Sequence, residues 1–293
     1  MDWRALALGT LFVAMWSSAF TSARIIVADA PPFLALLVRF AISCALALAI
    51  GWAAGQRIAL GRAEWRAVIV FGLCQNALYL GLNFLAMRTV EASVAVVIAS
   101  LLPLAVAGLG FLFLAERLPR LALAGLAGGV AGVLVIMTAR IGAGADPIGS
   151  LLCVVAVLAL AVATLTVRGA STGGNLWMVV GLQMLVGAAA LLPVTLAFET
   201  WEVRWSAPML AAFAYTVLVP GLAATMIWFV LVGRIGATRA ATFHFLNPFL
   251  GVAIAAAVLG EAVALRDLIG VAIIMAGILA VQLSRPVTRP ARS

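Results

Sequence analysis

The segment LNPFLGVAIAAAVLGE (Leu246–Glu261) has an outline that recurs earlier in the chain as LLPLAVAGLGFLFLAE (Leu101–Glu116). Both segments are apolar almost throughout, carry proline as their third residue and end in glutamate. Pro103 and Pro248 are 145 positions apart, and so are the two glutamates. Two such segments in one register indicate an internal duplication.

The composition is that of an integral membrane protein. The chain has 293 residues, of which 66% are hydrophobic and 10% are charged. Soluble domains average roughly 45–50% apolar and about 25% charged residues. A soluble core cannot bury so large an apolar share, so we expect the lipid bilayer to be the main partner of this chain.

The charged residues indicate topology and no nucleic-acid partner. All 18 basic residues are arginine, and the formal charge is +8. A nucleic-acid interface concentrates its basic residues in one patch, whereas these arginines are spread singly between apolar runs. The three cysteines lie inside apolar runs without metal-ligand spacing, so we expect no metal site.

Ten apolar segments are long enough to span a membrane, which takes about 20 residues each. They are Ala5–Ile25, Phe33–Ala54, Arg66–Ala86, Ala92–Ala115, Leu121–Ala139, Gly149–Val167, Leu176–Phe198, Pro208–Leu231, Thr238–Gly260 and Asp267–Leu283. The loops between them are short, so any chemistry must take place among the helices. The predicted fold class is an all-α integral membrane protein with ten transmembrane helices.

The arginines predict that both termini are cytoplasmic, and we expect the protein to lie in the inner (plasma) membrane. Cytoplasmic loops carry an excess of Lys and Arg. With the N-terminus inside, twelve arginines fall on the inner side and five on the outer side.

The duplication predicts two inverted five-helix repeats around a central cavity, residues 1–140 and 141–293. The offset of 145 also pairs Gly125 with Gly270 and Gly132 with Gly277. Because five is odd, the second repeat enters the membrane from the opposite side. Inverted repeats that meet at a midplane site are typical of secondary transporters.

Four motifs together resemble those of the drug/metabolite transporter superfamily, in particular its EamA-type ten-helix members. They are MWSSAF (Met15–Phe20), PPFLALLVRF (Pro31–Phe40), LLPL…LAE at the end of span four and LNPF…LGE at the end of span nine. Within the superfamily the chain most resembles the YddG-type exporters of aromatic and other neutral amino acids. The resemblance implies a bundle whose cavity opens alternately to each side, lined mainly by spans one, three, four, six, eight and nine.

The repeated prolines and glutamates are candidate hinge and gate residues. Pro103 and Pro248 each remove a backbone hydrogen bond and are expected to kink their helices. Glu116 and Glu261 stand at helix C-termini, where the dipole disfavours a carboxylate, so we expect compensating partners such as Arg117, Arg120 or Arg266.

Arg39 is the one basic residue well inside a predicted span. Charges within membrane spans are costly and usually functional. Arg39 lies about two turns into span two, so two alternatives stay open. It either ties helices together or extends its charge to the outer interface.

Span three carries the most informative polar set, with Gln75 and three residues on one predicted helical face, Asn76, Tyr79 and Asn83. Amides and a phenol can bind the ammonium and carboxylate groups of a zwitterion without a fixed charge. The alternative is interhelical hydrogen bonding, for which membrane helices often use Asn and Gln.

Further candidates for substrate binding come from five other spans. His244 is the only histidine and could shuttle protons or bind a carboxylate, since its pKa lies near physiological pH; hydrogen bonding alone is the alternative. Tyr215 and Trp16 could stack on an aromatic substrate. The remaining polar candidates are Ser17, Ser100 and Thr164.

Several enzyme classes lack their motifs here. The chain has no phosphate-binding loop with lysine, no HExxH and no GxSxG, so ATP hydrolysis, metalloprotease and lipase activities are unsupported. We expect no cofactor, no metal and no ATPase subunit. A membrane-embedded enzyme or assembly protein would not explain the duplication.

We therefore expect a monomeric exporter of small neutral amino acids, aromatic ones in particular, or related metabolites. No Asp or Glu lies near the middle of a span, and proton antiporters usually use an ionisable relay there. Facilitative transport is favoured. The alternative is a proton-coupled exporter of other metabolites or drugs with the same fold, coupled through His244.

Overall fold

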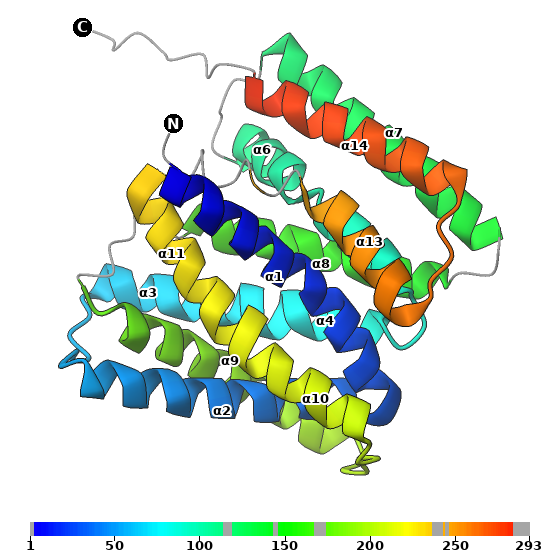
Figure 1. The fold of residues 1–293 in the computed structure, drawn as a ribbon. Helices are drawn as coiled ribbons and strands as arrows, with labels where there is room; N and C mark the ends of the chain where they lie inside the picture. The colour runs from blue at the N-terminus through cyan, green and yellow to red at the C-terminus, as the bar shows by residue number, and fades with distance from the viewer. Residues whose placement is uncertain are drawn as a thin grey trace, which may run out of the picture.

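The computed structural model describes residues 3–113, 119–142, 146–166, 174–235, 243 and 246–283, and their regular structure is helical. Figure 1 shows the helices packed into one bundle. The helices are α1 (Trp3–Asp29), α2 (Pro32–Ala53), α3 (Arg62–Phe71), η1 (Gly72–Leu80), α4 (Gly81–Ala86), α5 (Ala92–Ala99), α6 (Leu102–Phe113), α7 (Arg120–Gly142), α8 (Pro147–Thr166), α9 (Leu176–Phe198), α10 (Ala207–Thr216), η2 (Val217–Ala223), α11 (Ala224–Ile235), α13 (Asn247–Leu259) and α14 (Leu265–Leu283).

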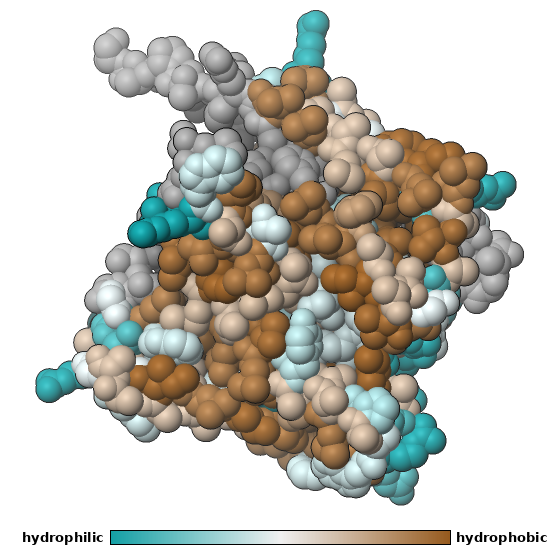
Figure 2. Space-filling model, viewed as in Figure 1, coloured by the Kyte–Doolittle hydropathy of each residue, from teal (hydrophilic) through white to brown (hydrophobic). Residues whose placement is uncertain are grey.

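The helices confirm the all-α membrane fold. Seven helical stretches of the described chain are long and apolar enough to cross a membrane, and two shorter apolar helices accompany them. Span seven begins and ends at the predicted residues, Leu176 and Phe198. Large apolar side chains such as Phe113 and Phe198 are about four-fifths exposed, and Figure 2 shows apolar residues over most of one face. A surface of this kind is stable in lipid.

The helix boundaries repeat along the chain. Four helices of the first half have a counterpart in the second half that starts 145 positions later. The pairs are α3 with α10, η1 with η2, α6 with α13 and α7 with α14. The offset is the one that aligns the two proline–glutamate segments. Matched starts of this kind are what a duplicated five-helix unit requires. The division at residues 140 and 141 stays a prediction.

Glycines allow α7 and α14 to pack side by side at one edge of the bundle (Figure 1). A Cβ added at Gly277 would lie 2.6 Å from the Gly125 carbonyl oxygen and 2.7 Å from the Gly129 nitrogen. At Gly132 it would lie 2.8 Å from the Gly270 carbonyl oxygen. Small residues permit this close approach of helix backbones in membranes.

Spans three and eight each contain a π-helical segment, η1 and η2, between α-helical ends. In η2, Pro220 has no N–H to donate to the Thr216 carbonyl, as an α-helix would require. A wider turn is the expected result. Nothing comparable in the sequence marks η1. Segments of this type are frequent at functional sites, and here they occupy matched positions in the two halves.

Candidate functional site

Span four is interrupted in the middle of the bundle. α5 ends at Ala99, and α6 begins at Leu102. The Ser100 hydroxyl donates to the Val97 carbonyl at 2.6 Å and so satisfies one free acceptor at the end of α5. The predicted kink within a continuous helix is corrected: Pro103 is the second residue of a new helix, where its missing N–H costs no intrahelical bond.

α13 starts in the same way as α6. It begins at Asn247, so Pro248 is also a second residue. Broken helices near the membrane midplane, with their free backbone groups, are a recurring feature of transporter binding sites. Because α6 and α13 begin at matched positions, each half of the chain contributes one such helix start. Whether these prolines act as hinges stays a prediction.

α1 joins the start of α13 through two buried polar side chains. The Ser17 hydroxyl donates to Asn247 Oδ1 at 3.2 Å, and both side chains are at most 3% exposed. The ring of Trp16, the neighbouring candidate, lies 5.6 Å from that of Phe12. The sequence pattern predicts Ser17 and Trp16 as site residues, and the structure adds Asn247. Its position directly before the repeated proline was the signal for it.

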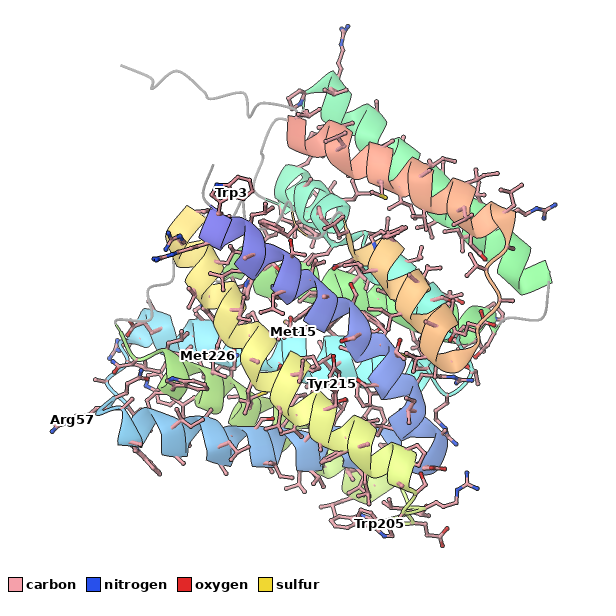
Figure 3. All side chains as sticks on the ribbon, viewed as in Figure 1. Trp3, Met15, Arg57, Trp205, Tyr215 and Met226 are labelled. Atoms are coloured by element: carbon pink, nitrogen blue, oxygen red, sulfur yellow. The ribbon has the colours of Figure 1, made fainter. Side chains whose placement is uncertain are left out.

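The C-terminal half of α1 is hydrogen-bonded to α10 at two levels. Ser18 and Tyr215 share a hydroxyl–hydroxyl hydrogen bond of 2.6 Å. The Thr216 hydroxyl donates to Ser22 at 2.7 Å, one helical turn further along α1. Figure 3 shows Tyr215 beside α1, and its side chain is 38% exposed. The phenol is therefore held by protein, and stacking of its ring on a substrate stays a prediction.

The predicted common face of Asn76, Tyr79 and Asn83 depends on α-helical periodicity along span three. The π-helical turn of η1 alters the register on which the predicted face rested. Asn76 Nδ2 donates to the Gln183 carbonyl of α9 at 2.8 Å, as the interhelical alternative expects. Asn83 Nδ2 donates to the Tyr79 carbonyl, and the Tyr79 side chain is buried in the core. Gln75 is also buried.

Thr164 forms a local hydrogen bond. Its hydroxyl donates to the Leu160 carbonyl within α8 at 2.8 Å. The hydroxyls of Thr164 and Ser100 can still accept hydrogen bonds. Substrate binding by these residues, and by the polar residues of span three, stays a prediction.

An open cleft of about 980 Å³ lies where the ends of α1, α4 and α13 meet the start of α10. Its charged lining residues are Arg24, Asp29, Arg88, Glu91, Arg204 and Glu261. At one side of the cleft, Asp29 at the end of α1 forms an ion pair with Arg204 at 2.6 Å and accepts a hydrogen bond from Ser206, just before α10. On the predicted topology this cleft faces outward.

Comparison with known proteins identifies the architecture. The profile of the EamA-like transporter family matches residues 3–138 and again residues 147–283. The chain belongs to the EamA-like transporter family. Among its relatives, the Bacillus subtilis (strain 168) transporter YvbV is 25% identical over 279 residues, which cover 94% of this chain and 90% of YvbV.

Two further relatives and one solved structure agree with this assignment. The Bacillus subtilis (strain 168) transporter YdeK is 28% identical, over 87% of this chain and 88% of its own. Protein PecM of Dickeya dadantii (strain 3937) is 25% identical, over 74% and 73%. A crystal structure with 22% sequence identity superimposes with a TM-score of 0.69, over 96% of this chain and 98% of its own, which supports the fold.

In this EamA-family protein, Glu261 binds the start of another helix. Its two carboxylate oxygens accept hydrogen bonds from the backbone N–H groups of Ala92 at 2.9 Å and Ser93 at 3.0 Å. The expected arginine partner was wrong for Glu261. The positive end of the α5 dipole compensates the carboxylate instead. Glu261 thus links the end of span nine to the start of span four.

Arg39 of the transporter is enclosed within the bundle. Its side chain is only 4% exposed, so the guanidinium does not extend to the surface as one alternative expected. It faces η2, where a Cβ added at Gly221 would lie 3.6 Å from Arg39 Nη2. Its Nε atom has no hydrogen-bond partner among the described residues.

Two predicted site residues, Glu116 and His244, lie outside the described residues. Their roles as a gate residue and as a proton or carboxylate partner remain predictions.

Proposed function

We propose that this transporter exports small neutral amino acids, aromatic ones among them, by alternating access. The observation that carries the proposal is the pair of helix starts at Leu102 and Asn247. These two helix starts occupy matched positions in the two halves of the chain. Ser17 of α1 is hydrogen-bonded to Asn247, the first residue of α13. A substrate held between two such halves becomes accessible to each side in turn as one half moves against the other.

The polar groups within the spans favour a neutral cargo. Every acidic residue of the described chain lies in a loop or in a terminal turn of a helix. A cationic drug would therefore find no carboxylate in the middle of the described spans. The polar side chains available there are hydroxyls and amides, with Arg39 as the buried cation. This set suits a zwitterion with one carboxylate better than a phosphorylated solute with two or more charges.

Facilitative transport follows from the same distribution of charge. Proton antiport usually requires an ionisable group that titrates within the membrane, and the described spans offer no carboxylate in their middle. Proton-coupled export of other metabolites or drugs, through His244, is the second candidate. We place both termini in the cytoplasm on the strength of the arginine distribution, and we propose a monomeric protein in the inner membrane.

The test is uptake into proteoliposomes that contain the purified chain. Labelled phenylalanine, threonine and a sugar are supplied with and without an imposed pH gradient. We expect saturable uptake of both amino acids, suppressed by unlabelled competitor and insensitive to the gradient. Strict dependence on the gradient would replace facilitative transport with proton coupling. Uptake of the sugar in place of the amino acids would refute the proposed cargo.

A further inference from the structure

Arg39 is a buried cation for which the described chain provides no counter-charge. No ion pair within 4.0 Å joins its guanidinium to a described carboxylate, and its Nε atom lacks a hydrogen-bond partner there. Buried charges in proteins are ordinarily paired, because an unpaired one is costly. Within a membrane span the cost is high enough that such residues are generally functional.

A second unpartnered group lies on the same face of α2. Ser43 follows Arg39 by one helical turn, is fully buried, and its hydroxyl has no hydrogen-bond partner among the described residues. Both side chains face Gly221 of η2. A Cβ added to that glycine would lie 3.6 Å from Arg39 Nη2 and 3.6 Å from Ser43 Oγ. A guanidinium and a hydroxyl therefore converge on a position that has no side chain.

The two halves of the fold differ at this position. Gly221 is the counterpart of Asn76, which lies 145 positions earlier in the matching π-helical segment. In the first half, the Asn76 side chain occupies the space and donates to the Gln183 carbonyl at 2.8 Å. In the second half, the amide is replaced by hydrogen, and Arg39 and Ser43 approach from the neighbouring helix. The backbone of η2 itself requires glycine here, since a Cβ at Gly221 would lie 2.8 Å from the Thr216 carbonyl oxygen. What packing leaves unexplained is that Arg39 Nε and the Ser43 hydroxyl beside it have no hydrogen-bond partner among the described residues.

We propose that Arg39 and Ser43, where they face Gly221, bind the carboxylate group of the transported solute. Arginine presents a planar fork that matches a carboxylate with two parallel hydrogen bonds, and the Ser43 hydroxyl can donate a third. The position lies about two turns from the start of α2 and beside η2, which is in the middle of span eight between α10 and α11. This inference rests on the proposed function and specifies which end of the amino acid is recognised there.

The first test compares phenylalanine with phenylalaninamide, which lacks the carboxylate, as unlabelled competitors of labelled phenylalanine uptake. We expect phenylalanine to compete ten- to a hundred-fold better in the wild type, the range expected for a hydrogen-bonded charge. In Arg39→Gln this preference should fall to nearly one, and in Arg39→Lys to an intermediate value. Arg266→Gln, which changes an exposed arginine in the same way, should retain the wild-type preference.

The second test separates binding from a structural role. The described chain gives Arg39 no counter-charge, and its guanidinium lies 5.6 Å from the centroid of the Phe40 ring. Arg39→Gln should therefore melt no lower than the wild type in detergent. It should also lose the rise in melting temperature that phenylalanine causes. A lower melting temperature with an unchanged preference for phenylalanine would make Arg39 an interhelical tie and overturn the proposal. Ser43→Ala and Arg39→Lys provide the same comparison if Arg39→Gln does not fold.

The proposal and the proposed function can fail separately. Amino-acid uptake that is unaffected in all three variants would refute the carboxylate subsite and leave the function in place. If the wild type transports no amino acid, the function fails, and stabilisation by benzoate or acetate then decides the subsite. Stabilisation of the wild type but not of Arg39→Gln supports the subsite, and equal stabilisation of both refutes it.

Discussion

The contact between Glu261 and the start of α5 predicts that replacing this glutamate separates the start of span four from the end of span nine. In Glu261→Ala, the N–H groups of Ala92 and Ser93 lose their carboxylate acceptor. Loss of a side-chain cap at a helix N-terminus costs about 0.5–2 kcal/mol. Glu261 is only partly buried, so we expect about 1–2 kcal/mol. If the contact exists in one conformation only, this shifts the balance between conformations roughly 5–30-fold.

The assay is pulsed electron paramagnetic resonance between spin labels at Arg88→Cys and Val263→Cys. Both sites are exposed, and they lie next to α5 and Glu261, respectively. The native cysteines, Cys44, Cys74 and Cys153, are first replaced. In Glu261→Ala, we expect a longer-distance population to grow at the expense of the wild-type one.

Glu199→Ala is the matched control. The Glu199 carboxylate accepts hydrogen bonds from the N–H groups of Phe33 at 2.9 Å and Leu34 at 2.7 Å, and so caps α2 as Glu261 caps α5. Its loss should lower the melting temperature by a similar amount without changing the label distances. Equal destabilisation in both variants, with unchanged distances in both, would show that Glu261 is only a helix cap and would refute its role as a gate.

Three other predictions follow from the packing and the charges. Gly277→Ala should cost about 1–3 kcal/mol, because its methyl group would meet backbone atoms of α7, whereas Gly108→Ala, with nothing within 4 Å, should not lower the melting temperature. Ser17→Ala should reduce uptake several-fold and cost about 1–3 kcal/mol of stability, because Asn247 Oδ1 loses a buried donor. Ser150→Ala, which removes a partly buried hydrogen bond at the start of α8, should lower the melting temperature but leave uptake unchanged; equal uptake in the two variants would contradict the site. The wild-type rate of phenylalanine uptake should be the same with and without an inward pH gradient, and a gradient-driven accumulation would indicate coupling.

The architecture could be predicted from sequence because it depends on apolar length and on repetition. A span needs about 20 apolar residues wherever it lies, so Leu176–Phe198 could be assigned without knowledge of its neighbours. The pairing of Pro103 with Pro248 needed only a constant offset, and the same offset reappears in the helix starts.

The details of the candidate site could not be predicted, because they depend on hydrogen bonds that hydrophobic patterns do not encode. The face assigned to Asn76, Tyr79 and Asn83 assumed an α-helix, and η1 is a π-helix. Glu261 was expected to find an arginine near it in sequence, but its partners are backbone groups about 170 positions away. Pro220 was the available signal for η2, since proline removes the hydrogen bond on which an α-helix depends.

Counterflow tests the central claim most directly, because only a carrier that exposes one site alternately to each side shows it. Proteoliposomes are loaded with unlabelled phenylalanine and diluted into a trace of labelled phenylalanine, without a pH gradient. We predict a transient accumulation of label above its equilibrium level, absent from liposomes without protein and diminished in Ser17→Ala. Equilibration without an overshoot would indicate a channel, and no uptake of label would contradict amino-acid transport.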